Sequence, residues 1–413
     1  AGATSGTVAN AKATTGSTST GNATYYGEYA VAGKITVNSG TYTANAATSS
    51  AYGIGSTDRV KTVRNVNGVF ANRDAATDPQ GSLGGAAEAY PELYIHGGSF
   101  SATTGTTTAV AVKSGGNTLI DGGTFNAYAG GSTAYGLYVT AGKTVANGVT
   151  FPASATTVAY GVYVFAAISD WSLFPYAGEV ELNNCNVTAT ARTTTDARGV
   201  YVYGLSKVYT QASFDAMKTA NNSYYKNYGD YAQVGERSIV GKATINNCTI
   251  KAKAATTKAY AVHSAAKQIQ GEKETAPSIV INSGKFWSEA TSDYADISPE
   301  CVPGYCIVKG GYYRNDAYIT PVLDEGYNVF ALQQNKEEHE TAYNEGYRWH
   351  VTNGFTGEVV CKVTHGPTTK IYDKLESAFN YVNDTMAANT AATIILCANY
   401  TLPAGNYTIP SNV

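Results

Sequence analysis

The chain has 413 residues, including 43 Gly and 33 Tyr, and only 14% of its residues are charged. Its formal net charge of −3 argues against a nucleic-acid partner, because phosphate binding needs clustered Lys and Arg, and the sequence contains no such cluster. A membrane-spanning helix needs about eighteen or more consecutive apolar residues, and no such run occurs, so we expect no membrane span.

Residues 1–33 are expected to form an N-terminal arm or a first irregular coil. This segment is rich in Gly, Thr and Ser, and residues 1–22 contain one Lys and no aromatic residue. The first residue is Ala1 rather than Met, which we expect to reflect a removed signal peptide or a trimmed chain.

One short phrase recurs from residue 34 to residue 315: an apolar residue, Asn or Asp, a small residue, Gly, any residue, and an aromatic or β-branched residue. Its copies are VNSGTY at 37–42, IHGGSF at 95–100, IDGGTF at 120–125, INSGKF at 281–286 and VKGGYY at 308–313, with weaker copies LNNCNV at 182–187 and INNCTI at 245–250 and a shifted copy, ANGVTF, at 146–151. The shortest spacings between copies are 25 to 27 residues, which we interpret as one coil. Longer spacings indicate a coil with an insertion or an additional, unrecognised coil.

A second phrase lies between copies of the first. It reads AYGIG at 51–55, AVAV at 109–112, AYGLYV at 134–139, AYGVYV at 159–164, ARGVYV at 197–202 and AYAVHS at 259–264. Both phrases alternate in polarity with the period of a β-strand. Coils of about 20–30 residues made of strands are typical of β-solenoids. We therefore predict an all-β fold, a right-handed parallel β-helix (β-solenoid) over residues 34–315, with insertions at one corner.

Stacking the second phrase gives a testable register. The predicted inward column is aliphatic and consists of Ile54, Val110, Leu137, Val162, Val200 and Val262. The residues that follow them form the predicted outward column, Gly55, Ala111, Tyr138, Tyr163, Tyr201 and His263. A slip of one residue would exchange the two faces, so this separation favours the register.

The C-terminal part differs from the repeats. Residues 316–358 contain DEGYNVF and NEGYRWHV and are predicted to form a short hairpin-like β domain. Residues 359–413 are predicted to be a mixed helix–strand segment, either a cap or the start of a second β-helix. Within it, Leu375, Ala378, Phe379 and Val382 share one face of a helix expected at 373–382. We expect strands at 392–398 and 407–409.

The repeated phrases, together with DEGYNVF, resemble the repetitive β-helical surface proteins of gut and anaerobic bacteria, over roughly residues 34–349. This resemblance implies an extracellular, cell-surface location and an adhesin-like or surface-layer-like role. Pectate lyases share the fold, so the fold by itself does not decide activity. The sequence shows no recognisable anchoring motif of such families.

Candidate catalytic chemistry is sparse. A polysaccharide lyase or hydrolase would need a base such as Arg198 and a stack of carboxylates, whereas Asp121 is the only carboxylate at a repeat position held mostly by Asn. We predict no catalytic, cofactor or metal residues. Tyr138, Tyr163, Tyr201 and His263 are the candidate interaction ladder, for a sugar or another subunit, unless they only stabilise their own sheet.

The six cysteines have no C-x-x-C spacing. Cys301 and Cys306 flank a Pro-Gly turn and are candidates for one disulfide, and Cys361 and Cys397 are candidates for another. Cys185 and Cys248 occupy one repeat position, where a disulfide and two buried thiols are both compatible with the sequence.

The sequence therefore favours a non-catalytic, extracellular structural or adhesive protein without cofactors. Its expected partners are further copies of itself in a fibre, sheath or layer, or a cell-surface or polysaccharide ligand. The alternative is a polysaccharide-active β-helix enzyme. Low charge and the unpaired strand edges at the ends of a solenoid favour self-association.

Overall fold

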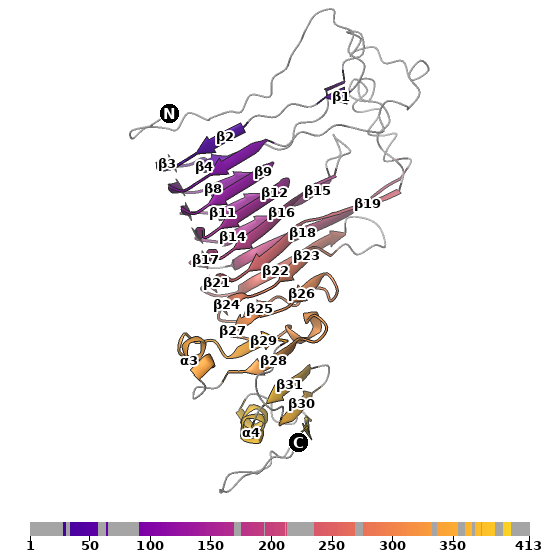
Figure 1. Ribbon diagram of the computed structural model, residues 1–413. Helices are drawn as coiled ribbons and strands as arrows, with labels where there is room; N and C mark the ends of the chain where they lie inside the picture. The colour runs from indigo at the N-terminus through magenta and orange to yellow at the C-terminus, as the bar shows by residue number, and fades with distance from the viewer. Residues whose placement is uncertain are drawn as a thin grey trace, which may run out of the picture.

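The computed structural model describes residues 28–29, 34–56, 63–64, 91–168, 175–193, 195–210, 212, 235–268, 276–332, 337–353, 360–365, 368–372, 374–384 and 391–397. The predicted arm at residues 1–33 and the strand at 407–409 lie almost entirely outside these ranges. Within them, the chain is mostly β-strand (Figure 1).

Most strands belong to three long sheets in which neighbouring repeats pair in parallel. The first sheet contains β2 (Lys34–Val37), β6 (Glu92–Ile95), β9 (Asn117–Asp121), β12 (Gly142–Asn147), β16 (Pro175–Asn183), β20 (Lys242–Asn246), β23 (Ser278–Ile281) and β26 (Cys306–Val308). The second begins with β3 (Thr41–Ala46), β7 (Ser99–Thr104), β10 (Thr124–Ala129), β13 (Thr150–Ala155), β17 (Asn186–Ala191), β21 (Cys248–Ala254), β24 (Gly284–Glu289) and β27 (Gly311–Tyr313). The third contains β4 (Ala51–Gly55), β8 (Thr108–Ser114), β11 (Thr133–Val139), β14 (Val158–Val164), β18 (Asp196–Tyr209), β22 (Lys258–Gln268) and β25 (Asp293–Ile297).

The chain visits the first, second and third sheets in that order and then repeats the cycle, so the strands stack like rungs along the molecule (Figure 1). The pairing shows that every copy of the first phrase is followed in the stack by the next copy. The long spacings are therefore insertions and not additional coils. They leave the third sheet near Gly55, Ala167, Leu205 and Ala266 and return to the first sheet, as predicted.

Three short strand pairs accompany the insertions. β1 (Glu28–Tyr29) pairs antiparallel with β5 (Val63–Arg64). β15 (Ala166–Ile168) pairs antiparallel with β16, and β19 (Gly235–Val240) pairs antiparallel with β18. Each pair departs from the parallel pattern of the main sheets. In the β15–β16 and β18–β19 pairs, the chain reverses direction across an insertion, whereas β1 precedes the first repeat and pairs with a strand of the first insertion.

The core is a set of columns that run through successive repeats. Rings that end the first phrase point inward and stack, with centroids 4.7 Å apart for Tyr42 and Phe100 and 4.8 Å apart for Phe100 and Phe125. Phe286 and Tyr313 repeat this contact at 4.8 Å near the other end. The aromatic position of the phrase is therefore a core position, which explains why Val or Ile replaces the ring elsewhere.

The predicted inward column of the third sheet is mostly right but contains one error. Leu137, Val162, Val200 and Val262 are aligned and fully buried. The residue aligned with Leu137 in β8 is Val112, not Val110, and Lys113 rather than Ala111 aligns with Tyr138. Ile54 belongs to the column but is only half-buried, because its strand β4 is the last of the sheet.

Two kinds of turn join the first and second sheets. Where the phrase carries Gly at its fourth position, that residue has positive φ, as at Gly98 (112°) and Gly123 (108°). Where Val149 or Cys185 takes that position, the preceding residue has positive φ instead: 62° at Gly148 and 54° at Asn184. Gly and Asn tolerate this backbone best. The copy at 146–151 is consequently in register with its neighbour and not shifted.

Beyond β27 the second sheet continues with pairs that are antiparallel except for the parallel pair of β28 (Asn328–Ala331) and β31 (Thr368–Tyr372). β29 (Trp349–Thr352) pairs with both β27 and β28, and β31 connects β28 to β30 (Cys361–His365) and β32 (Thr393–Leu396). The helical elements here are η1 (Thr320–Val322), α3 (Glu337–Asn344) and α4 (Leu375–Asp384). As predicted, α4 buries Leu375, Ala378 and Val382. None of the helices in the described ranges is long and apolar enough to cross a membrane.

Candidate functional site: an aromatic band on the third sheet

The predicted ladder residues Tyr138, Tyr163, Tyr201 and His263 are aligned across β11, β14, β18 and β22. A second column, three residues earlier in each strand, runs beside them on the same face. We call the two columns and their flanking rings the aromatic band. Its members are Tyr135, Tyr138, Tyr160, Tyr163, Phe165, Tyr201, Tyr203, Tyr260 and His263.

A small residue in each strand places both columns on one face: glycine in β11, β14 and β18, and Ala261 in β22. Residues three apart in a regular strand point to opposite faces, yet Tyr135 and Tyr138 stack on each other at 5.0 Å. Gly136 lies between them and adds one buried position to the alternation. A Cβ atom at Gly136 would lie 2.6 Å from a neighbouring carbonyl oxygen, and one at Gly161 would lie 2.2 Å from the side chain of Val187. Glycine therefore avoids a collision with the next strand at Gly136 and with the core side chain of Val187 at Gly161.

The rings of the band cover one another's faces. Ring centroids are 5.1 Å apart for Tyr135 and Tyr160, with planes only 9° from parallel, and 5.3 Å apart for Tyr138 and Tyr163 at 16°. Nearly parallel rings this close must overlap, since coplanar neighbours would collide. The overlap removes the ring faces that a sugar would need for stacking. The edges and hydroxyl groups of the half-buried rings remain accessible.

Burial keeps the phenols of the band neutral. It raises the pKa of Tyr201 to about 12, and it raises the pKa of Tyr135 and Tyr163 further. Nearby phenols add to this effect because two adjacent phenolates would repel each other. The hydroxyl groups therefore act as hydrogen-bond donors and acceptors over the whole physiological pH range.

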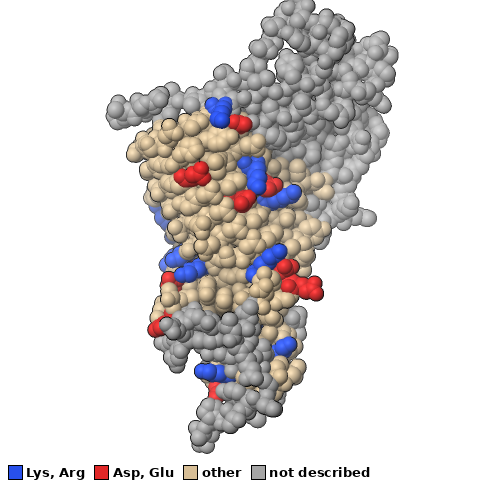
Figure 2. Space-filling model, in the orientation of Figure 1, with Lys and Arg blue, Asp and Glu red and all other residues tan. Residues whose placement is uncertain are grey.

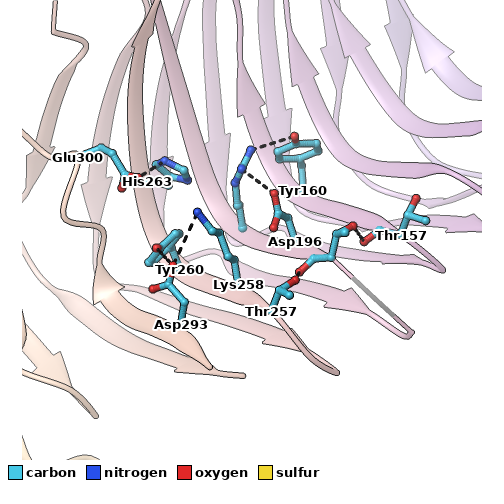
Figure 3. A network of polar contacts seen from close by, with 11 residues as sticks. Thr157, Tyr160, Asp196, Thr257, Lys258, Tyr260, His263, Asp293 and Glu300 are labelled. Atoms are coloured by element: carbon cyan, nitrogen blue, oxygen red, sulfur yellow. Dashed lines mark hydrogen bonds and ion pairs between the residues drawn. The ribbon is translucent and has the colours of Figure 1, made fainter. Parts of the chain in front are cut away.

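Arg198 interrupts the second column between Tyr160 and Tyr260. Its guanidinium group donates to the Tyr160 hydroxyl at 3.0 Å and to the Asp196 carboxylate at 2.8 Å (Figure 3). It also lies over the Tyr201 ring, 4.6 Å from the centroid. The arginine thus continues the stack of rings and contacts Tyr160, Asp196 and Tyr201 within the same sheet.

Charged residues border the band in a column of alternating sign. Asp196, Lys258 and Asp293 are aligned on β18, β22 and β25 (Figure 3). Lys258 Nζ lies 3.7 Å from Asp293, whose carboxylate also accepts a hydrogen bond of 2.8 Å from the Tyr260 hydroxyl. Each of these charges consequently has a partner within the sheet.

His263 ends the first column beneath Tyr201, with ring centroids 4.9 Å apart. Burial, together with the nearby charges of Arg198 and Lys258, lowers the pKa of His263 to about 3. The imidazole is therefore neutral at pH 7, although its Nε2 lies 3.6 Å from the Glu300 carboxylate. Its side chain is 6% exposed, so it acts as a ring of the ladder rather than as a surface histidine.

The cysteine predictions have mixed outcomes. All six cysteines are free thiols in the structure. Cys361 and Cys397, the candidates for one disulfide, are not adjacent in the strand register: Cys361 pairs with Leu396, and Cys397 is exposed and one residue out of register. Cys301 and Cys306 are buried together, and a mutual hydrogen bond of their thiols raises the pKa of Cys306, but they are not bridged.

Cys185 and Cys248 stack in adjacent repeats, as the repeat position predicts. The backbone N–H of Cys185 donates to Cys248 Sγ over 3.3 Å, and both thiols are buried. The two cysteines occupy the turn position that is glycine in other copies. The structure therefore agrees with the interpretation in which two buried thiols fill this core position.

Outside the band, charge is sparse. Figure 2 shows few Lys, Arg, Asp and Glu side chains on a largely uncharged face, most of them in small groups of both signs. Several form cross-strand pairs, such as Lys34 with Glu92 at 3.5 Å and Lys143 with Glu181 at 3.0 Å. Over the described part of the chain, no three His, Cys, Asp or Glu side chains come together as a metal site would require.

Sequence reasoning found one column of the band and missed the other as a site. Tyr135 and Tyr160 stand three residues before the predicted ladder, which a strict period of two assigns to the opposite face. The signal that would have found them is the glycine between the two aromatic positions.

In comparisons with known proteins, no family model, curated protein or solved structure matches this chain.

Proposed function

We propose that the chain is a right-handed parallel β-helix that serves as a non-catalytic structural or adhesive protein on a cell surface. Three parallel sheets visited in constant order support the fold. The resemblance of the repeated phrases to bacterial surface proteins supports the location.

The observation that carries this proposal is the internal pairing of the band. Its ring faces stack on each other, and Arg198 and Lys258 contact Asp196 and Asp293 within the same sheet. A catalytic base must instead be available to the proton that it abstracts. The polar and aromatic residues of the band thus stabilise the stack, which suits a protein whose role is to be a rigid rod.

The alternative is a polysaccharide lyase or hydrolase, and the same residues define its test. Arg198 and Lys258 are the basic residues that such an enzyme would use on this face. The chain should be incubated with acidic polysaccharides while ultraviolet absorbance reports unsaturated products and a reducing-sugar assay reports hydrolysis. We expect no turnover above buffer. Steady product formation that is lost in both Arg198→Gln and Lys258→Gln would refute the non-catalytic proposal.

The ends of the second sheet support self-assembly as part of this proposal. β3 and β32 are the first and last strands of the same 13-stranded sheet. At the β3 end, the core residues Ile35, Val37 and Tyr42 are only half-buried. At the β32 end, Ile395 and Leu396 are 50% and 58% exposed. An edge strand with apolar side chains templates further pairing.

The proposed contact is head-to-tail, with β32 of one copy beside β3 of the next. Such a contact joins two different surfaces, so it does not close on itself and grows into a fibre or layer. Ile395→Lys together with Leu396→Lys should shift light scattering toward the monomer, whereas Val302→Lys, at an exposed apolar residue away from both edges, should not. A monodisperse monomer of the unchanged chain at every concentration would leave a monomeric adhesin.

A further inference from the structure

A buried ion pair connects the C-terminal segment to the end of the parallel repeats. Lys370 lies on β31, and its Nζ is in contact with the carboxylate of Asp316, which lies in the loop after β27. The Lys370 side chain is only 3% exposed, and that of Asp316 is 23% exposed. No other ion pair in the described ranges buries its amine this deeply.

Aromatic rings enclose the amine of Lys370. Its Nζ lies 3.8 Å from the ring centroid of Trp349 on β29 and 3.9 Å from that of Tyr381 on α4. The two rings themselves meet edge to face at 5.9 Å. This enclosure excludes water from the amine while leaving it open toward Asp316.

The backbone beside Asp316 is held in place by another buried carboxylate. Asp296 Oδ2 accepts the backbone N–H groups of Arg314 at 2.6 Å and Asn315 at 2.8 Å. Its Oδ1 accepts the hydroxyl of Ser288 at 2.6 Å. These bonds fix the loop, so Asp316 is presented to Lys370 by a rigid support rather than by a mobile segment.

We propose that Lys370 and Asp316 condense to an intramolecular amide bond that staples the C-terminal segment to the last parallel repeat. A proton first passes from the ammonium group to the carboxylate, which gives a neutral amine and a carboxylic acid. The amine nitrogen then attacks the carboxyl carbon with its lone pair. The new C–N bond forms, the C–OH bond breaks, and the hydroxyl group leaves as water with one proton from the nitrogen.

Two physical effects favour this step. Burial lowers the pKa of Lys370 to about 7, so the neutral amine is accessible near physiological pH, although the Asp316 charge acts in the opposite direction. Fixed proximity supplies effective concentrations of about 10⁵–10⁸ M in well-oriented intramolecular reactions, which lowers the barrier to attack of the amine on the carboxyl carbon. The reaction needs no oxidant, metal or activated donor.

The test is the mass of the intact, denatured chain. We expect it to be lower than the sequence mass by one water molecule, and a protease digest should contain a branched peptide that joins the Asp316 and Lys370 fragments. Lys370→Arg, which keeps the positive charge, should restore the full sequence mass. Asp316→Asn should release ammonia instead of water. The exposed pair Lys143–Glu181 is an internal control and should give no branched peptide.

An unchanged sequence mass in the folded, unsubstituted chain would overturn the proposal. A loss of water without the branched peptide would also overturn it, because cyclisation of an aspartate within its own backbone removes the same mass. Since the decisive measurement uses the chain without substitutions, it does not depend on whether a variant folds. It is also independent of the adhesive or structural role, because it reads only a covalent bond.

Discussion

The side-chain amide of Asn246 donates to the side-chain oxygen of Asn183 over 2.7 Å, although 63 residues separate them in the chain. The same bond recurs from Asn183 to Asn147 at 2.9 Å and from Asn147 to Asp121 at 2.7 Å. All donors point one way along the stack, and Asp121 ends the series because a carboxylate only accepts. The Asp121 that stood alone in the sequence is thus the terminus of an amide ladder.

Removing a central amide should cost more than removing a terminal one. Asn183→Ala breaks bonds on both sides and leaves a donor and an acceptor without partners, whereas Asn282→Ala breaks one bond. We expect a loss in unfolding free energy of about 2–3 kcal/mol for the first and about 1 kcal/mol for the second. Urea denaturation measures both. Equal losses would contradict a ladder that is coupled along its length.

The aromatic band should contribute to stability through its stacking. Tyr163 contacts four tyrosine rings, so Tyr163→Ala is expected to lower the unfolding free energy by about 3 kcal/mol. Tyr52, which is 52% exposed at the end of the sheet, is the matched control and should lose less than about 1 kcal/mol. If both substitutions cost the same in thermal or chemical unfolding, the band is not a cooperative ladder.

The ladder should weaken in acid because of His263. Its folded pKa of about 3 lies below its usual value, so between roughly pH 6.5 and pH 3 the unfolded chain binds a proton that the folded chain does not. Stability from this group is complete above pH 6.5 and falls with decreasing pH, by at most about 1.4 kcal/mol per pH unit. His263→Phe keeps a ring and removes the titration. Between roughly pH 7 and pH 4.5, the His263→Phe chain should lose less unfolding free energy than the unsubstituted chain. An identical loss in the two chains would refute the assignment.

Asp296 should give the opposite dependence on pH. Burial raises its pKa to about 7, so between roughly pH 4 and pH 7 the folded chain keeps a proton that the unfolded chain releases. The contribution to stability is present below that window and is lost as the pH rises through it. Asn preserves the acceptor for the two backbone N–H groups, so Asp296→Asn should gain stability relative to the unsubstituted chain as pH increases. Denaturation at several pH values measures this difference, and a constant difference would show that Asp296 does not titrate there.

The parallel stacking of strands could be predicted because it depends on a local signal. Each coil repeats a turn with Asn and Gly and an alternation of apolar residues, and Leu137, Val162 and Val200 are buried where that alternation places them. The error at Val110 has a physical reason. The copy AVAV lacks the glycine that marks the extra residue in most other copies, and its apolar residues look alike two positions apart.

Contacts between non-repeating segments could not be predicted. Lys370 and Asp316 lie in different parts of the C-terminal region, where no periodic pattern relates one segment to another. Cys361 and Cys397 are candidates for a disulfide because both lie in the final segment, whereas in the structure a register shift of one residue separates them. Likewise, stacking of the tyrosine rings depends on ring orientation, which residue types do not specify.

Electron microscopy of the purified chain at increasing concentration tests the central claim most directly. We predict elongated rods that join end to end, with an axial repeat equal to the length of one stack and with the contact between β3 and β32. Separate particles at every concentration, with no end-to-end contact, would contradict the self-assembling structural role.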